Sequence, residues 1–230
     1  MRPGELTVLI AAPLGALMLD AIRPKVARIG DRGHLVCGLT SGLLLGTAFF
    51  VLLGQALQYR IPSSGSADIL SCAGIGFIGT VILHRCWYFY RQRLGTFQTE
   101  IPSMLIRGTT GAAVGAALHT SPTTGLMVAA TLLLREVGSP TNTPRTVEPA
   151  AGLSKAPRLR SIMVLAGCLT FVALSSISAG NLSIILAVTA GSCVYMGAGI
   201  LVPETHHAHP QAPTLAMTAL GSLLVYLVVA

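Results

Sequence analysis

The sequence predicts an all-α, polytopic membrane protein with eight transmembrane helices, and two properties of the chain carry this prediction. First, its 230 residues are 52% hydrophobic and only 10% charged, with a mean hydropathy of +0.71. Soluble domains usually carry about 25% charged residues, so most of this surface is expected to face lipid. Second, the apolar residues fall into runs close to the length of about 20 residues that an α-helix needs to cross a bilayer.

The apolar runs define the expected spans and the connections between them. The fourth and fifth runs are short, and residues 120–123 (TSPT) between them are predicted to form a tight turn. Residues 139–158 are rich in Pro, Thr and Ser and are expected to form a loop. The chain is predicted to be a single transmembrane domain, with spans at residues 5–22, 35–57, 67–90, 104–119, 124–138, 161–179, 182–202 and 213–230.

The distribution of Lys and Arg decides whether the fourth and fifth runs cross separately or form one broken helix. With eight spans, eleven basic residues fall on one side and two on the other; the eleven are Arg23, Lys25, Arg28, Arg32, Arg85, Arg91, Arg93, Arg145, Lys155, Arg158 and Arg160, and the two are Arg2 and Arg60. Cytosolic connections carry such an excess. One broken helix would instead place the basic third and fifth connections on opposite faces. We therefore predict eight spans, both termini on the non-cytosolic side, and a cytosolic loop at 139–158.

Composition and motifs also restrict the class of function. The net charge of +7 does not indicate nucleic acid, because Lys and Arg lie in the gaps between apolar runs rather than on one face with interleaved aromatic residues. The expected partners are the lipid bilayer and other membrane proteins, in a homo- or hetero-oligomer. The five cysteines show no C-x-x-C spacing, which argues against a disulfide framework or a cysteine metal site. The spans hold no convincing Ser/His pair, paired carboxylates or H-E-x-x-H motif, so an enzyme is not expected.

Two of the expected spans share a sequence pattern. Residues 40–42 (TSG) and 51–55 (VLLGQ) match residues 189–191 (TAG) and 200–204 (ILVPE) at a constant offset of 149 residues. The second and seventh spans would cross the bilayer in opposite directions. The match therefore predicts an inverted repeat of spans 1–3 and 6–8 around a central hairpin, a 3+2+3 arrangement typical of transporters. Chance similarity between two glycine-containing apolar helices is the alternative.

Glycines recur at intervals of four residues in two of the expected spans. Gly38, Gly42 and Gly46 lie in the second span, and Gly111 and Gly115 lie in the fourth. Small residues at this spacing let the backbones of membrane helices approach one another closely. The spacing therefore predicts close helix packing along both rows.

Short motifs in four of the spans follow a fixed order. Residues 42–50 (GLLLGTAFF) resemble G-x-x-l-G-t-A-F-f, and residues 190–204 contain A-G-x-x-x-Y followed by P-E. Residues 110–116 (TGAAVGA) and 131–137 (TLLLREV) resemble D-G-l-A-i-G-a and t-i-l-l-H-E-v. In this order they resemble the ZIP (Zrt/Irt-like) divalent metal transporters, of which the chain would be a divergent member. The resemblance implies a 3+2+3 inverted-repeat bundle that moves zinc as its transported ion.

The resemblance also implies a metal site, built in ZIP proteins from H-N-x-x-D on helix four and H-E-x-P-H-E on helix five. Imidazole and carboxylate groups four residues apart share a helix face and suit a divalent ion such as Zn²⁺. Most of these ligands are replaced here. Helix four has Ile106, Arg107 and Thr110 where the family has His, Asn and Asp. Helix five has Arg135 in place of His and residues 138–140 (GSP) in place of P-H-E, so Glu136 is the one candidate metal ligand retained.

The two arginines leave two structural alternatives and two functions open. Arginine stays protonated and cannot bind a metal, so both side chains would repel Zn²⁺. Arg107 and Arg135 either form an intramembrane charge cluster with Glu136, or lie about one turn from the cytosolic span ends and snorkel to the interface. Zinc transport is the function that the resemblance implies. A transport-inactive relative serving as a structural or interaction subunit is the alternative.

A second metal-binding hypothesis concerns the seventh connection. His206, His207 and His209 follow Glu204 there, and histidines three residues apart can share a metal ion. They are a possible weak cytosolic site that collects metal. A surface cluster without a specific role is the alternative.

Overall fold

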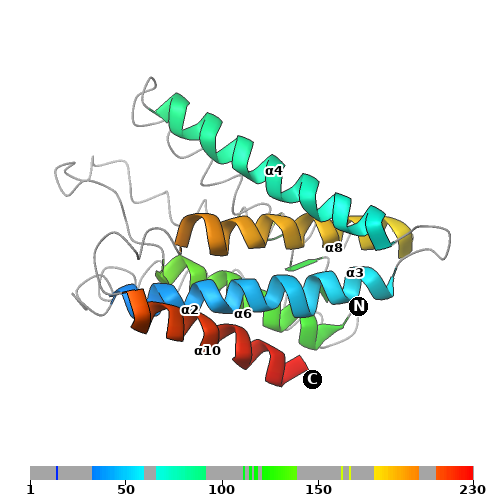
Figure 1. The fold of residues 1–230 in the computed structure, drawn as a ribbon. Helices are drawn as coiled ribbons and strands as arrows, with labels where there is room; N and C mark the ends of the chain where they lie inside the picture. The colour runs from blue at the N-terminus through cyan, green and yellow to red at the C-terminus, as the bar shows by residue number, and fades with distance from the viewer. Residues whose placement is uncertain are drawn as a thin grey trace.

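A computed structural model describes residues 33–59, 66–91, 121–138, 179–201 and 211–229, together with residues 14, 111, 114, 115, 117, 118, 162 and 166. The regular structure in these residues is helical, so the all-α prediction is confirmed for this part of the chain (Figure 1). Four stretches are long and apolar enough to cross a membrane, as expected of an integral membrane protein. They are Leu35–Gln58, Ala67–Cys86, Gly180–Ala198 and Ala212–Val229, which coincide with the predicted spans two, three, seven and eight.

Two of the long helices contain a π-helical segment. In chain order, the elements are α2 (Gly33–Gly46), η2 (Thr47–Leu53), α3 (Gly54–Gln58), α4 (Ser66–Arg91), α6 (Pro122–Gly138), α8 (Ala179–Val194), η5 (Tyr195–Leu201) and α10 (Gln211–Val229). The π-helix η2 joins α2 to α3 without a break, and η5 likewise extends α8. The helix α6 has 17 residues and corresponds to the predicted fifth span. Most residues of the predicted spans one, four and six, and the loop at 139–158, lie outside the described residues.

The stretch from α2 to α3 is helical for reasons visible in its sequence. Residues 35–58 contain neither proline nor a charged residue, and a helix satisfies the backbone hydrogen bonds of such a segment in lipid. One of its polar side chains is satisfied within the same helix. Thr40, which is buried, donates from its Oγ1 to the carbonyl oxygens of Val36 and Cys37, each at 2.9 Å. The segment is therefore compatible with complete burial in lipid or protein.

The helices α2 and α10 approach each other along a row of glycines. The carbonyl oxygen of Thr214 would lie 2.7 Å from a Cβ atom placed on Gly38. One turn further along, a Cβ atom on Gly42 would meet the backbone carbonyl of Thr218, and one on Gly221 of α10 would lie 2.5 Å from the carbonyl oxygen of Leu39 in α2. The residue numbers of the paired positions increase in the same direction along both helices, so the two helices run parallel. The close packing predicted for the glycine row of α2 is confirmed.

Hydroxyl groups of α10 add hydrogen bonds across this close contact. Thr218 donates from Oγ1 to the carbonyl oxygen of Gly38 at 3.1 Å, and Ser222 donates from Oγ to that of Gly42 at 3.0 Å. These bonds form because a glycine has no side chain between the hydroxyl and the neighbouring backbone. Small residues and interhelical hydroxyl bonds together are the usual basis of helix association in membranes.

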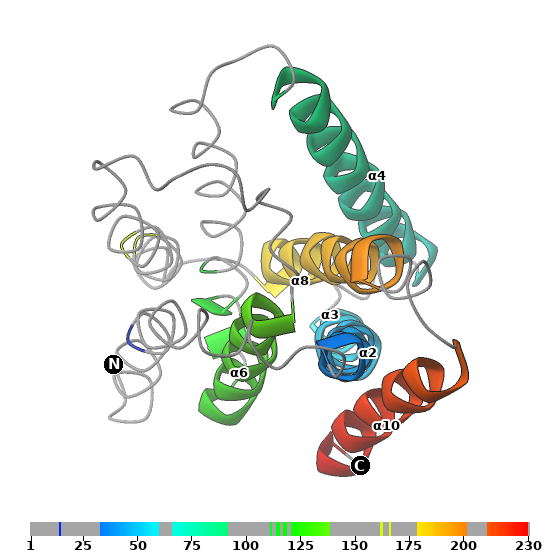
Figure 2. The same cartoon turned by 90° about the vertical axis from the view of Figure 1, so that its left-hand side faces the viewer.

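The helices α4 and α8 form a second close, parallel pair (Figure 2). A Cβ atom on Gly76 would meet the backbone carbonyl of Val188, and one on Gly191 would meet that of Ala73. The hydroxyl of Thr80 donates to Ser192 Oγ at 2.9 Å one turn further along α4. Both helix pairs are therefore held by glycine contacts and hydroxyl hydrogen bonds.

The two close pairs use matching positions in the chain. The matched positions are Leu39 with Val188, Gly42 with Gly191, Ala73 with Thr218, and Gly76 with Gly221. The first two matches are separated by 149 residues, the offset of the sequence pattern, and the last two by 145. In the first pair, Gly42 meets Thr218 while Gly221 meets Leu39; in the second, Gly191 meets Ala73 while Gly76 meets Val188. These two contacts of the first pair thus have counterparts in the second.

The helices α2 and α8 join the two pairs and run in opposite directions (Figure 1). In the first half of the α2–α3 stretch, Ser41 Oγ donates to the carbonyl oxygen of Gly197, late in the α8–η5 stretch, at 3.0 Å. At the other end, Ser183 Oγ, early in α8, donates to the carbonyl oxygen of Ala56 in α3 at 2.6 Å. The antiparallel direction therefore follows from contacts at both ends.

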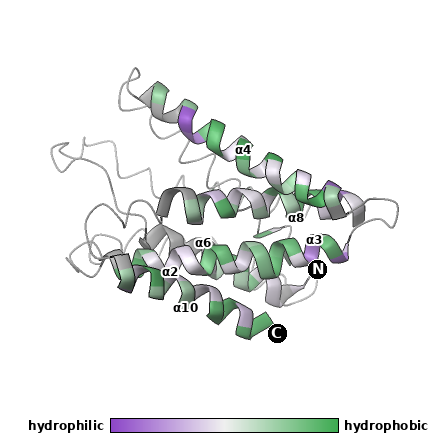
Figure 3. Ribbon diagram, viewed as in Figure 1, coloured by the Kyte–Doolittle hydropathy of each residue, from purple (hydrophilic) through white to green (hydrophobic). Residues whose placement is uncertain are grey.

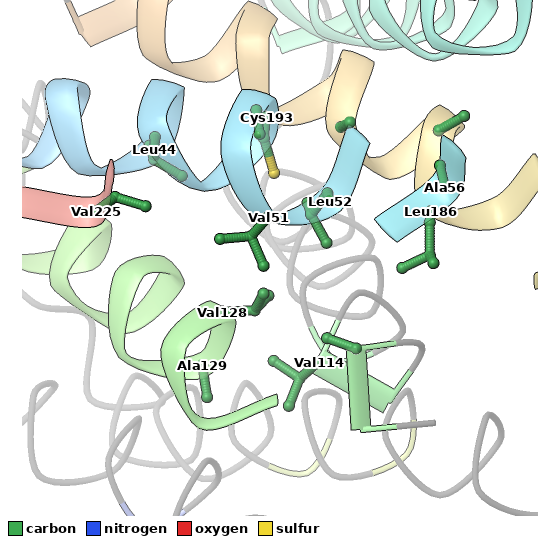
Figure 4. Close-up of a cluster of buried hydrophobic side chains, with 14 of the residues drawn as sticks. Leu44, Val51, Leu52, Ala56, Val114, Val128, Ala129, Leu186, Cys193 and Val225 are labelled. Carbon is green, nitrogen blue, oxygen red and sulfur yellow. The ribbon is translucent and has the colours of Figure 1, made fainter. Parts of the chain in front are cut away.

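The buried core lies where these helices meet α6. Figure 4 shows Val51 of η2, Val128 of α6 and Val114 in one cluster, with Leu44 and Leu186 nearby. The outward faces of α4 and α10 are apolar as well (Figure 3), with exposed side chains that include Ile75, Ile78, Leu223 and Leu227. Soluble monomers rarely expose such large apolar patches, whereas helices that face lipid do so along their length.

Candidate functional site

The helix α6 begins with a well-formed N-terminal cap. Ser121 precedes α6, and its Oγ accepts a hydrogen bond from the backbone N–H of Thr124 at 3.0 Å. Pro122 occupies the first helical position, where a missing N–H costs nothing. The Ser121 N–H itself donates to the carbonyl oxygen of Ala117 at 3.2 Å. The chain therefore leaves the preceding segment and enters α6 within the turn predicted between the fourth and fifth runs.

Replacing Ser121 by alanine is expected to lower the stability of the protein by about 1 kcal/mol, because it leaves the first turn of α6 without its side-chain acceptor. The measurement is the thermal unfolding midpoint of the purified protein in detergent. Ser71→Ala is the control, since Ser71 is exposed on α4 and its hydroxyl bonds only to Ala67 of the same helix. Equal midpoints for the two variants would contradict this role of Ser121.

A pair of threonine hydroxyls joins α6 to the π-helical part of the second span. Thr47 of η2 donates from Oγ1 to Thr131 Oγ1 at 3.1 Å, and both side chains are buried. Thr131 in turn donates to the carbonyl oxygen of Met127 at 2.9 Å. Thr47 also lies at the centre of the membrane-length stretch Leu35–Gln58. The contact therefore fixes which side of α6 lies against the second span.

Three buried residues mark the side of α6 that faces the bundle. Thr124, Val128 and Thr131 form a row at the helical spacing of three to four residues. Arg135 and Glu136 follow in the last turn of the helix.

The predicted metal-site residues are only partly within the described part of the chain. Arg135 and Glu136 lie in α6, where the structure gives their place in the helix. The helix-four positions Ile106, Arg107 and Thr110 lie outside the described residues, and so do His206, His207 and His209 of the seventh connection. Among the described residues, no three His, Cys, Asp or Glu side chains gather into a group that could hold a metal ion.

Two features near the centre of the bundle were not expected from the sequence. The π-helices η2 and η5 begin at Thr47 and Tyr195, at nearly corresponding positions of the α2 and α8 stretches. Segments of π-helix are rare and occur often at functional sites. No residue type in these apolar segments signals the change of helix geometry, which explains why sequence reasoning missed it.

The second unexpected feature is a polar contact between α4 and η5. Tyr195 is buried, and its hydroxyl lies 3.2 Å from Nδ1 of His84. The Tyr195 ring also stands edge-on to that of Phe77, with the ring centres 5.6 Å apart. Tyr195 belongs to the A-G-x-x-x-Y motif, so its presence was noted, but nothing in the sequence indicated His84 as its partner.

Comparison with known proteins adds no assignment to this geometry: no protein-family profile and no curated protein sequence matches the chain.

Proposed function

We propose that the chain is a ZIP-like membrane transporter that moves a divalent metal ion, with zinc the expected ion, by alternating access. The proposal includes eight spans in a 3+2+3 inverted-repeat bundle with both termini on the non-cytosolic side. The observation that carries it is the correspondence between the α2–α10 and α4–α8 contacts. Inverted repeats of this kind are a frequent basis of transporter folds, in which the transported ion binds near the middle of the bilayer.

The pairing of α2 with α10 and of α4 with α8 indicates which helices would move during transport. In the proposed repeat, α2 and α4 belong to the first half, and α8 and α10 belong to the second. Each close pair therefore joins one helix from each half, with backbone against backbone at Gly42 and Gly191. Separating the halves would break both contacts. We infer that the four helices stay together and that the central hairpin, which includes α6, moves against them.

One observation favours the second candidate function, a transport-inactive relative that acts as a structural or interaction subunit. At the positions of the family ligands the chain has Ile106, Arg107, Thr110 and Arg135. None of these side chains binds Zn²⁺ well, and a guanidinium group repels it. In this alternative the scaffold is kept and the metal site is lost.

A measurement of zinc uptake distinguishes the two candidate functions. The expected result for a transporter is uptake of radioactive zinc by liposomes that contain the purified protein, and loss of most of that uptake in Glu136→Ala, because Glu136 is the one family ligand retained. Asp68→Ala is the control, since it removes an exposed carboxylate at the start of α4.

The two possible results have opposite meanings. Uptake that disappears in Glu136→Ala but persists in Asp68→Ala would rule out the inactive relative. No uptake by the wild type, together with a thermal unfolding midpoint that millimolar zinc leaves unchanged, would rule out the transporter.

A further inference from the structure

In each of the two antiparallel helical stretches, α2–η2–α3 and α8–η5, the first part is fixed to a neighbour more firmly than the last part. Gly42 of α2 meets the backbone of α10, and Gly191 of α8 meets the backbone of α4. Among the described residues, nothing lies within 4 Å of a Cβ atom at Gly54 in α3. For Gly197 in η5, the nearest atom is Leu45 Cγ, in a flexible side chain, at 3.1 Å. Both stretches therefore become more loosely packed toward their ends.

The π-helix of each stretch lies close to the point where the firm contacts end. The glycine row of α2 ends at Gly46, and η2 begins at the next residue, Thr47. In the other stretch, η5 begins at Tyr195, about one turn after Gly191. A π-helix holds one more residue in each hydrogen-bonded turn than an α-helix, and such turns are a common cause of kinks. Each π-helix therefore stands between a firmly packed part and a looser part.

The two looser parts lie at opposite ends of the bundle. We call residues 47–58, which comprise η2 and α3, the first arm, and residues 195–201, which comprise η5, the second arm. The stretches run in opposite directions (Figure 1), so each arm lies beside an earlier part of the other stretch. A serine of that part donates to the arm, at the carbonyl oxygens of Ala56 and Gly197. In a bundle that crosses a membrane, the arms therefore lie toward opposite faces.

The first residue of each π-helix is bonded to a helix outside its own stretch. Thr47, at the start of η2, donates to Thr131 Oγ1 of α6 at 3.1 Å. Tyr195, at the start of η5, has its hydroxyl 3.2 Å from Nδ1 of His84 in α4. A shift of α6 or α4 therefore acts directly on the point where an arm begins.

We propose that the two π-helices are hinges, and that each converts between π and α geometry when its arm moves. Conversion to an α-helix returns the extra residue to the regular spiral, which turns the arm by about 100° and lengthens the stretch by about 1.5 Å. In the first arm this rotation turns Ala56 away from α8 and breaks its hydrogen bond with Ser183. The use of the hinges rests on the proposed function: one arm opens at each face of the membrane, as alternating access requires.

Deletion of a single residue tests whether η2 holds one residue more than an α-helix would. Phe49 of η2 has an exposed fraction of 51%, and its loss lets the turn close as an α-helix while the contacts on both sides are kept. Ile184, with an exposed fraction of 48%, is the matched control in the α-helical part of α8. Its deletion turns Ser183 away from Gly191 by about 100°, so the contacts of these two residues with α3 and α4 cannot both form.

The thermal unfolding midpoint of the purified protein in detergent is the first measurement. Deletion of Phe49 is expected to shift the midpoint by less than about 4 °C, whereas deletion of Ile184 is expected to lower it by more than about 10 °C. Deletion of Ala198, an exposed residue of η5, repeats the test in the second arm. The proposal is overturned if both π-helix deletions lower the midpoint as far as the deletion of Ile184 does.

Amide hydrogen exchange is the second measurement, and it reports the motion itself. In the wild type the first arm is expected to exchange through opening of its π-helix. Deletion of Phe49 is expected to slow exchange in the first arm and to leave that of α2 unchanged. Because the same residues are compared in two variants, their depth in the detergent micelle does not affect the comparison. Equal exchange of the first arm in both variants would show that η2 does not act as a hinge.

Transport measurements keep this proposal distinct from the proposed function. Slower exchange and loss of zinc uptake on deletion of Phe49, with the midpoint kept, would support both. Slower exchange on this deletion, in a protein whose wild type takes up no zinc, would support the hinges and contradict transport. Zinc uptake by a wild type whose exchange is the same as that of the deletion variant would leave the transporter intact and overturn the hinges.

Discussion

Gly42→Ala is expected to destabilise the protein more than any other single methyl group added to the described helices of the second span. A Cβ atom at this position would meet the backbone carbonyl of Thr218 in α10, and neither backbone can move without shifting a whole helix. Overpacking of a tight contact typically costs about 1–3 kcal/mol. The loss of the Ser222 hydrogen bond to the Gly42 carbonyl, which needs the same close approach, would add to this cost.

Gly54→Ala is the matched control on the same helical stretch. Nothing lies within 4 Å of a Cβ atom at Gly54, and alanine favours a helix over glycine by about 1 kcal/mol. This variant is therefore expected to be as stable as the wild type or slightly more stable. Both variants are compared by thermal unfolding in one detergent. A midpoint for Gly42→Ala that matches that of Gly54→Ala would contradict the close contact.

The same comparison applies to the second helix pair. Gly191→Ala would place its methyl group against the Ala73 carbonyl, while Gly79→Ala on α4 meets nothing within 4 Å. If the two pairs are equivalent, the loss of stability at Gly191 should be similar to that at Gly42. A large effect at one glycine and none at the other would show that only one pair depends on close backbone contact.

The helices could be predicted from the sequence because their cause is local. Long runs without charge, such as residues 35–58, must satisfy their backbone hydrogen bonds internally in lipid. The row from Gly38 to Gly46 likewise indicated close packing from its spacing alone. Its partner could not be predicted, because the small residues of α10 and of α4 offer similar surfaces. Which helix lies against Gly42 depends on the arrangement of the whole bundle.

The sequence predicted which residue types stand at the candidate site, but it did not predict how they are arranged in space. The sequence has Arg135 at the position where the ZIP resemblance implies a histidine ligand, and it left open whether this arginine faces the interior or the interface. Almost every residue of α6 from 125 to 134 is apolar or small, so no polar side distinguishes its buried face. The contact between Thr47 and Thr131 shows which side of α6 lies against η2. That contact is long-range, with 84 residues between its partners, and has no local signal.

Installing the ligands that the ZIP resemblance implies is expected to give the chain a stronger zinc site than the wild type has. The variant combines Ile106→His, Arg107→Asn, Thr110→Asp and Arg135→His with the native Glu136. It removes both cations and supplies imidazole and carboxylate ligands at the spacing that suits a tetrahedral ion. Zinc at about 100 times the dissociation constant should then stabilise the variant by about 2.7 kcal/mol, and a chelator should reverse the effect.

The control for this experiment is the double variant Arg107→Gln with Arg135→Gln, which removes the same charges without adding ligands. If zinc stabilises both variants equally, repulsion by the two arginines is what limits zinc binding in the wild type, and Glu136 with native groups is sufficient to hold the metal. If zinc stabilises neither, although both unfold cooperatively, helices four and five do not face each other as the resemblance implies. Stabilisation of the restored variant alone would place both helices around one site, with Arg135 at the position from which a metal ligand was lost.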